Sequence, residues 1–162
     1  MGFTTFSGPV RSGTVRQGAN TALNTGTPVL AQTAVVGFAS VTTSPTAVAL
    51  FTLPAGAKIV RFNYDKTTAF AGNGVTAVGA QIGTAGSAAL YQASVAVAIT
   101  AGKTSTATVD AGIASAQTDN IGTADVTLYG TFTATTGNPT SGSMTVTVEY
   151  LQRAADGTQN PA

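Results

Sequence analysis

The chain contains no histidine, no cysteine and no tryptophan. Without an imidazole, no side chain can take the proton of a serine or cysteine nucleophile, which excludes Ser–His–Asp and Cys–His catalysis. Without cysteine the chain has no disulfides, and metal sites built from Cys or His are excluded as well. These absences remove several large classes of enzyme and the common structural zinc sites.

Charge is also scarce, because Asp, Glu, Lys and Arg together make up 8% of the 162 residues, against about a quarter in a typical domain. Seven basic and six acidic residues give a net charge of +1. A nucleic-acid-binding protein would need a basic patch or stripe, so no nucleic-acid partner is expected. So small a net charge produces little repulsion between copies, which permits close self-association.

Long apolar runs are missing too. No stretch approaches the roughly 20 apolar residues of a membrane-spanning helix, so no membrane partner is expected. Residues 1–9 read MGFTTFSGP and lack the basic-then-apolar layout of a signal peptide. We therefore expect a protein that is made in the cytoplasm and released by assembly or lysis.

The carboxylates are scattered singly from residue 65 onward, as Asp65, Asp110, Asp119, Asp125, Glu149 and Asp156. A glycosidase needs two carboxylates that face each other across a cleft, and nothing in this spacing pairs them. Residues 119–125, DNIGTAD, resemble a calcium loop in outline but lack its acidic ligands and terminal Glu, so a solvated turn is expected. The chain is predicted to be no enzyme, with no cofactor, no metal and no small-molecule substrate.

What the sequence does contain is Thr, Val, Ala and Gly, which favours strands because branching at Cβ packs well on a pleated surface. Strand-like segments recur at the spacing of a sandwich, at residues 29–40, 47–53, 58–66, 75–82, 90–100, 105–116, 124–134 and 143–151. The Ala-rich residues 107–117 are also compatible with a helical turn. Turns are predicted at Pro54–Ala57, where Gly56 can take a positive φ, and at Gly72–Gly74.

Alternation predicts which side chains face the core. Val60, Phe62 and Tyr64 are expected on the inner face of their strand. The same pattern places Val126, Leu128 and Phe132, and then Val146, Val148 and Tyr150, on inner faces. Tyr129 and Tyr91 are the aromatic residues for which an interface or an exposed surface position is expected.

These features predict an all-β fold, a β-sandwich of jelly-roll type with about eight antiparallel strands and an extended N-terminal arm. An immunoglobulin-like sandwich is the alternative, although its Cys and Trp hallmarks are absent. The expected organisation is an arm at 1–27, the sandwich domain at 28–151 and a tail at 152–162. Residues 1–27 could equally be a frayed tail; fully extended they would reach about 90 Å.

Three segments resemble tailed-bacteriophage head (capsid) decoration or cement proteins. They are residues 6–14 (FSGPVRSGT), residues 51–60 (FTLPAGAKIV) with 67–70 (TTAF), and residues 142–150 (GSMTVTVEY). The resemblance covers the beginning, middle and end of the chain in this order. It implies a β-sandwich that binds the outer surface of an icosahedral head, often as a homotrimer near local three-fold positions, and that clamps major capsid protein subunits together.

From this resemblance and the residues we expect a virion protein whose partners are the major capsid protein and further copies of itself. Arg11 and Arg16, with Phe3 and Phe6, are the predicted contact residues of the arm, the two arginines facing acidic groups of the major capsid protein. Two alternatives stay open: a head fibre, tail or minor capsid protein, and an adhesin, carbohydrate-binding or ice-binding module.

Overall fold

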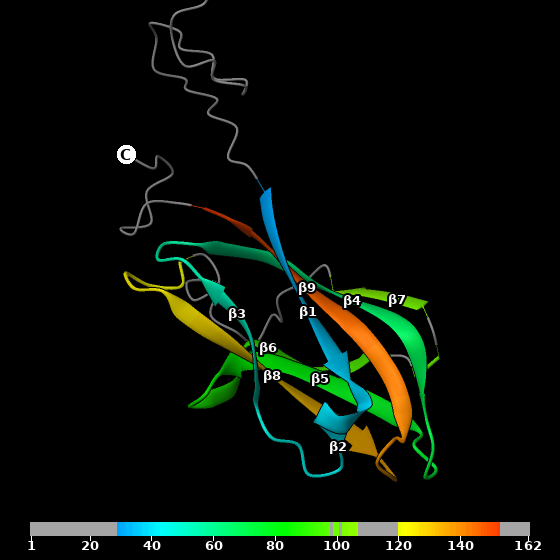
Figure 1. Cartoon of the computed structure of the whole chain (residues 1–162). Coiled ribbons are helices and arrows are strands. Elements are labelled where there is room, and N and C mark those ends of the chain that lie inside the picture. Colours follow the sequence, from blue (N-terminus) through cyan, green and yellow to red (C-terminus); the bar gives the residue numbers. More distant parts are fainter. Residues whose placement is uncertain (1–28, 98, 101, 107–119, 153–162) are drawn as a thin grey trace, which may run out of the picture.

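A computed structural model describes residues 29–97, 99–100, 102–106 and 120–152. In it, two β-sheets pack face to face (Figure 1). The all-β sandwich predicted from the sequence is therefore confirmed. The predicted arm, the C-terminal tail beyond residue 152 and the segment 107–117 lie outside the described residues.

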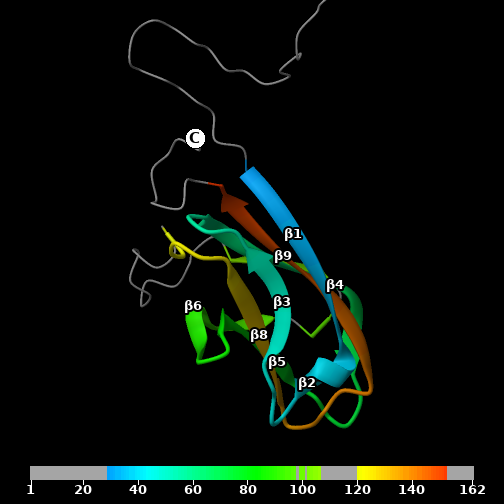
Figure 2. The same cartoon turned by 60° about the vertical axis from the view of Figure 1, so that its left-hand side comes forward.

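The first sheet has the strand order β1-β9-β4-β7. Its strands are β1 (Val29–Gly37), β9 (Ser141–Leu151), β4 (Lys58–Ala71) and β7 (Gly102–Thr106). All neighbours in this sheet are antiparallel. The strand β1 forms one margin of this sheet. Figure 2 shows β1 beside β9 from a second direction.

The second sheet has the order β2-β8-β5-β6, and β3 also pairs with β8. Its strands are β2 (Val41–Thr42), β8 (Val126–Thr135), β5 (Ala77–Thr84), β6 (Ser87–Val97) and β3 (Val48–Leu53). A 3-10 helix, η1 (Phe38–Ser40), leads from β1 into β2. The strand β2 runs parallel to β8, whereas β3 runs antiparallel to it. The β2–β8 pair therefore departs from the antiparallel pairing predicted from the sequence.

One inward and one outward assignment made from alternation are wrong, and register shifts explain both. Val60 is exposed, because the register of β4 against β9 shifts between Ile59 and Arg61 and the buried position falls on Ile59. A bulge inserts one extra residue and so reverses the side-chain alternation beyond it. The sequence pattern ended this strand at residue 66, but β4 continues to Ala71. Further register shifts on either side of Thr68 interrupt the alternation there, so the pattern did not predict the continuation.

Tyr91 is buried in the core and not at the surface. The register of β5 against β6 passes from Ala80 opposite Val95 to Ile82 opposite Gln92, so β6 carries one more residue than β5 in this interval. Both Tyr91 and Gln92 are consequently buried, which strict alternation does not allow. The two-residue strand β2 was not predicted, because it is too short to display any period.

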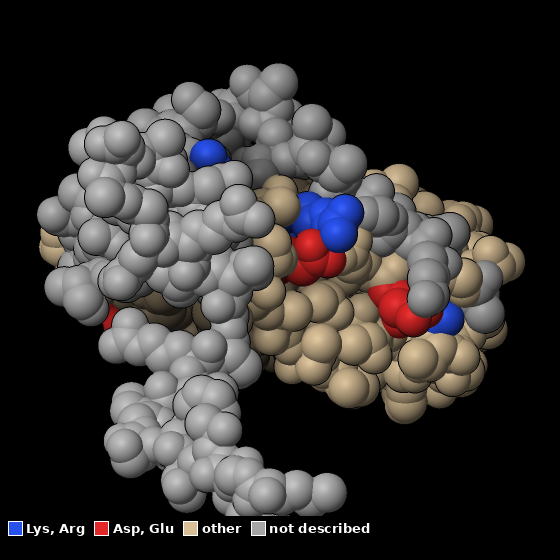
Figure 3. All heavy atoms as spheres, turned by 90° about the horizontal axis from the view of Figure 1, so that it is seen from above, with Lys and Arg blue, Asp and Glu red and all other residues tan. Residues whose placement is uncertain are grey.

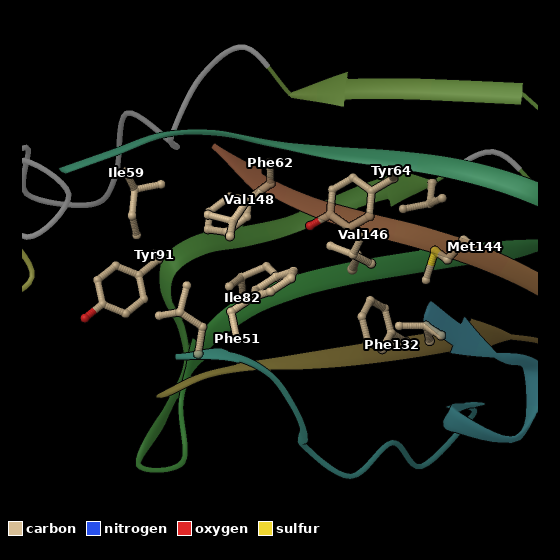
Figure 4. Close-up of a cluster of buried hydrophobic side chains, with 14 of the residues drawn as sticks. Phe51, Ile59, Phe62, Tyr64, Ile82, Tyr91, Phe132, Met144, Val146 and Val148 are labelled. Carbon is tan, nitrogen blue, oxygen red and sulfur yellow. The ribbon is translucent and has the colours of Figure 1, made fainter. Parts of the chain in front are cut away.

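The core lies between the inner faces of the two sheets (Figure 4). The alternation predicted for β8 and β9 is confirmed, with Leu128 and Phe132 buried on one strand and Val146, Val148 and Tyr150 on the other. Phe62 and Tyr64 come from β4 and Ile82 comes from β5. Burying side chains of this size stabilises a fold by roughly 1.5–3 kcal/mol each before the cost of ordering the chain.

One buried hydrogen bond joins the two sheets through this core. The phenol of Tyr64 on β4 donates to Oε1 of Gln92 on β6 at 2.6 Å, and both side chains are fully buried. Burial raises the pKa of Tyr64 well above its usual range, since the charged phenolate is disfavoured away from water. The phenol therefore stays protonated and available as a donor.

Tyr64→Phe is expected to lower the free energy of unfolding by about 1–3 kcal/mol, because the buried Gln92 oxygen loses this donor. Tyr129→Phe, on the outer face of β8, is the matched control, and a change within about 0.5 kcal/mol is expected. Chemical denaturation followed by circular dichroism measures both. Equal losses in the two variants would contradict the role given to the Tyr64–Gln92 bond.

Candidate interaction surfaces

The contact residues predicted from the sequence, Phe3, Phe6, Arg11 and Arg16, lie outside the described residues, so their role stays a prediction. Of the six carboxylates, Asp110, Asp119 and Asp156 also lie outside them. Within the described ranges no group of three or more His, Cys, Asp or Glu side chains is placed to hold a metal ion. The same ranges contain no helix with the length and apolar character needed to cross a membrane.

Charge is distributed unequally between the two sheets. Six of the seven charged residues in the described ranges lie on β4, β7 and β9 of the first sheet: Lys58, Arg61, Asp65, Lys66, Lys103 and Glu149. The seventh, Asp125, directly precedes β8. The described strands of the second sheet carry no charged residue at all. Figure 3 shows the few charged side chains as small groups amid uncharged surface.

The outer face of the first sheet carries a small polar network. Arg61 Nε donates to Glu149 Oε2 at 2.8 Å, and Asn63 Nδ2 donates to Glu149 Oε1 at 2.8 Å. Both oxygens of this carboxylate on β9 thus accept from side chains of the neighbouring strand β4. The pair is partly open to solvent, where an ion pair typically contributes less than about 1 kcal/mol.

Lys66 differs from these surface charges because it is buried. Burial lowers the pKa of its ammonium group, and the nearby charge of Asp65 opposes that change in part. Apart from Lys66, the outer face of the first sheet carries a partly exposed ion pair, as the solvent-exposed face of a sheet commonly does.

The outer face of the second sheet is defined here as the neutral face. It consists of the outward side chains of β3, β5, β6 and β8, namely Thr52, Ala77, Gly79, Gln81, Ser94, Ala96, Thr127, Tyr129, Thr131, Thr133 and Thr135. Thr131 lies opposite Gln81, and Thr133 lies opposite Gly79. None of these side chains is charged, so removing this face from water costs no ionic desolvation.

A second unusual surface is the free margin of the first sheet, defined here as the β1 edge, residues 29–38. Four of the five exposed large hydrophobic residues in the described ranges belong to it: Val29, Leu30, Val35 and Phe38. All nine residues of β1 pair with β9 on one side, and β1 ends the strand order on the other.

In the described part of the predicted solvated turn, residues 120–125, two side-chain oxygens accept hydrogen bonds from backbone amides. Asn120 Oδ1 accepts from the Gly122 amide at 2.9 Å, and Asp125 Oδ1 accepts from the Ala55 amide at 3.0 Å. The Gly56 amide in turn donates to the Gly122 carbonyl at 2.8 Å. Gly56 has a φ of 73°, which confirms the positive φ predicted for it in the turn at residues 54–57. These bonds join the turn before β4 to the turn before β8.

Comparison with known proteins gives little. No protein-family model matches the chain, and no curated protein matches it. A solved structure titled "Cyanophage Pam1 capsid asymmetric unit" contains a chain that is similar to this one, at 21% sequence identity and a TM-score of 0.48. The similarity covers 90% of this chain and 99% of that chain. A likeness of this degree establishes no family membership and no function.

Asp125→Ala is expected to lower the free energy of unfolding by about 1–2 kcal/mol, because the Ala55 amide loses its acceptor. Asp125→Asn keeps an oxygen at the same position and should recover most of the loss. Thermal unfolding with and without added Ca²⁺ completes the experiment. A calcium-dependent rise in melting temperature that Asp125→Asn abolishes would refute the purely structural interpretation of this turn.

Proposed function

We propose that the chain is a non-catalytic structural protein of a bacteriophage virion, a decoration or cement protein on the outer surface of the capsid. Its partner is the major capsid protein, whose neighbouring subunits it holds together. The observation that carries the proposal is the segregation of charge: one outer face of the sandwich is neutral and the other is charged. The cores of protein interfaces are depleted of charged residues, so the neutral face is the surface that packs against the shell.

The proposed orientation follows from the same contrast. The face that carries Arg61, Asn63 and Glu149 can stay hydrated, because its polar network already exists between partly exposed side chains. Turning that face to the shell would remove the Arg61–Glu149 ion pair from water, and the desolvation penalty of a buried ion pair can exceed its Coulombic gain. The neutral face has no such cost. The second sheet therefore lies toward the shell and the first sheet toward solvent.

A protein of this kind does not need a strong single contact. An uncharged surface rich in Thr, Gly and Ala offers modest affinity per copy, but copies that are linked in an oligomer make the contact several times at once. The sequence resemblance at residues 51–60 and 142–150 supports the same role, and it implies a trimer near local three-fold positions. We include that trimer in the proposal, since closed symmetry is the rule for repeated contacts.

The N-terminal residues complete the proposal. Residues 1–27 act as an arm that reaches a neighbouring subunit, with Arg11 and Arg16 directed at acidic groups and Phe3 and Phe6 at apolar ones. Arginine suits this task because its guanidinium binds carboxylates in a fixed fork.

The alternatives differ in observable ways. A head fibre, tail or minor capsid protein would occur in few copies per particle, whereas decoration needs hundreds. An ice-binding module would need Thr ladders across adjacent strands. In the described strands Thr faces Thr only at separate places, Thr52–Thr127, Thr42–Thr133 and Thr33–Thr147. Thr131 and Thr133 face Gln81 and Gly79 on β5, so no continuous threonine ladder crosses from β8 to β5, which argues against this alternative.

Thr131→Lys on the neutral face is expected to lower retention on purified heads by at least about tenfold, equivalent to ~1.4 kcal/mol, because a charge would be buried at the contact without a partner. Thr147→Lys, on the central strand β9 of the charged face, is the matched control and should bind as the unchanged protein does. Co-sedimentation with heads lacking the protein measures both. Loss of binding in Thr147→Lys alone would invert the proposed orientation.

Arg11→Glu with Arg16→Glu is expected to weaken head binding, and the weakening should shrink as salt rises, since exposed charges are screened beyond about 10 Å at 0.1 M ionic strength. Phe3→Ala with Phe6→Ala should weaken binding with no such salt dependence. Unchanged retention of both double variants would remove the arm from the proposal and leave the neutral face in place.

A further inference from the structure

The β1 edge lacks the features by which proteins usually protect a free sheet margin. Such margins carry charged side chains, proline or bulges that prevent pairing with another strand. Residues 29–38 contain no charged residue and no proline. The β1 ladder with β9 runs from Val29 opposite Leu151 to Gly37 opposite Ser143 without a register shift. The outward valines are strongly exposed, Val29 at 57% and Val35 at 77%.

We propose that β1 pairs with β1 of a second copy of the chain, antiparallel about a two-fold axis that passes by Gln32. In this register Val29 lies opposite Val35 of the second copy, and by symmetry Val35 lies opposite Val29 of the second copy. The two first sheets then join into one continuous sheet across the axis. Each copy covers the most exposed apolar side chains of the other.

The register follows from the side-chain pattern. Residues directly opposite each other in an antiparallel pair point to the same face, and apolar pairs stabilise the contact by roughly 0.2–1 kcal/mol each. Val29 and Val35 both point outward, six residues apart, so a strand that matches them needs two large apolar residues at that spacing. The strand β1 is therefore complementary to itself, as an isologous contact requires.

The N-terminal residues of the same chain do not meet this requirement. The large apolar residues among residues 1–27 are Met1, Phe3, Phe6, Val10, Val15 and Leu23. No two of them are six positions apart, so no strand from this segment can place large apolar side chains opposite both valines. Pro28 also fits the symmetric register, since it would stand opposite Val36 of the second copy and, having no N–H, would end the ladder there.

A contact made by one pair of strands is small beside a standard interface of about 1,600 Å². We expect weak association in solution that becomes effective when many copies are held on one surface. A two-fold contact through β1 is compatible with a three-fold contact elsewhere, because a hexagonal lattice contains both kinds of axis. The inference goes beyond the proposed function and is tested without any capsid.

Crosslinking between single-cysteine variants tests the register directly, and the chain's lack of cysteine gives no background. A mixture of Val29→Cys and Val35→Cys proteins, treated with a short bifunctional thiol reagent, should give a covalent dimer. Either protein alone should give several-fold less, because like positions are far apart in this register. The matched control is a mixture of Ala31→Cys and Val35→Cys, because position 31 is two residues away from the position that faces Val35. This mixture should give less dimer than the mixture of Val29→Cys and Val35→Cys. Crosslinking of Val35→Cys alone as efficiently as in the mixture, or of no combination, would overturn the proposal.

A charge exchange separates a second copy from any other occupant of the edge. Val35→Lys and Val29→Glu should each lower the association constant, measured by sedimentation equilibrium, by at least about tenfold. The double variant V29E/V35K should recover most of the loss, because the new carboxylate at position 29 faces the new ammonium at position 35 of the second copy. Within one chain the two positions are about 20 Å apart, too far to pair. A folded wild-type protein that stays monomeric at every concentration, or a double variant weaker than both single variants, would refute the contact.

Discussion

The structure depends on the packing of two apolar sheet faces against each other. Phe62, Tyr64 and Val146 of the first sheet meet Ile82 and Phe132 of the second in one continuous core, and the Tyr64–Gln92 hydrogen bond joins the sheets within it. Since β1 to β6, β8 and β9 each contribute buried side chains to this core, the outer faces and the free margins of the sheets are left for recognition. Within the described residues, recognition by the sandwich therefore falls to its outer surfaces, its free margins and its connecting turns.

The two outer faces differ in the property that matters most for binding. Desolvating a charge costs more than desolvating the hydroxyl and methyl groups of Thr and Ala. The chain has gathered its described strand charges on one sheet, around the Arg61–Glu149 pair, and has left the other sheet neutral. The β1 edge is a third kind of surface: it is apolar and lies at the margin of the charged sheet, without charged residues to prevent strand pairing. Binding to a shell through one face and to a second copy through one edge would use both unusual surfaces at once.

Much of the fold could be predicted from the sequence, where pairing is regular. The alternation in β8 and β9 placed Leu128, Phe132, Val146 and Val148 correctly, because strands in the middle of a sheet keep a period of two. Bulges defeated the same argument at Val60 and near Tyr91, since one extra residue reverses the faces and leaves no mark in composition. The neutral face could not be found from sequence alone, because knowing that β5 and β8 share a sheet requires their pairing. The exposure of β1 likewise depends on its being a margin.

The central claim is that the neutral face is covered and the charged face is open when the protein is in place. An electron cryomicroscopy map of heads carrying the protein tests this most directly. The account predicts β3, β5 and β8 against the shell, with the side chains of Arg61 and Glu149 facing solvent. A map in which β4 and β9 contact the shell, or in which the heads carry no such sandwich, would contradict it.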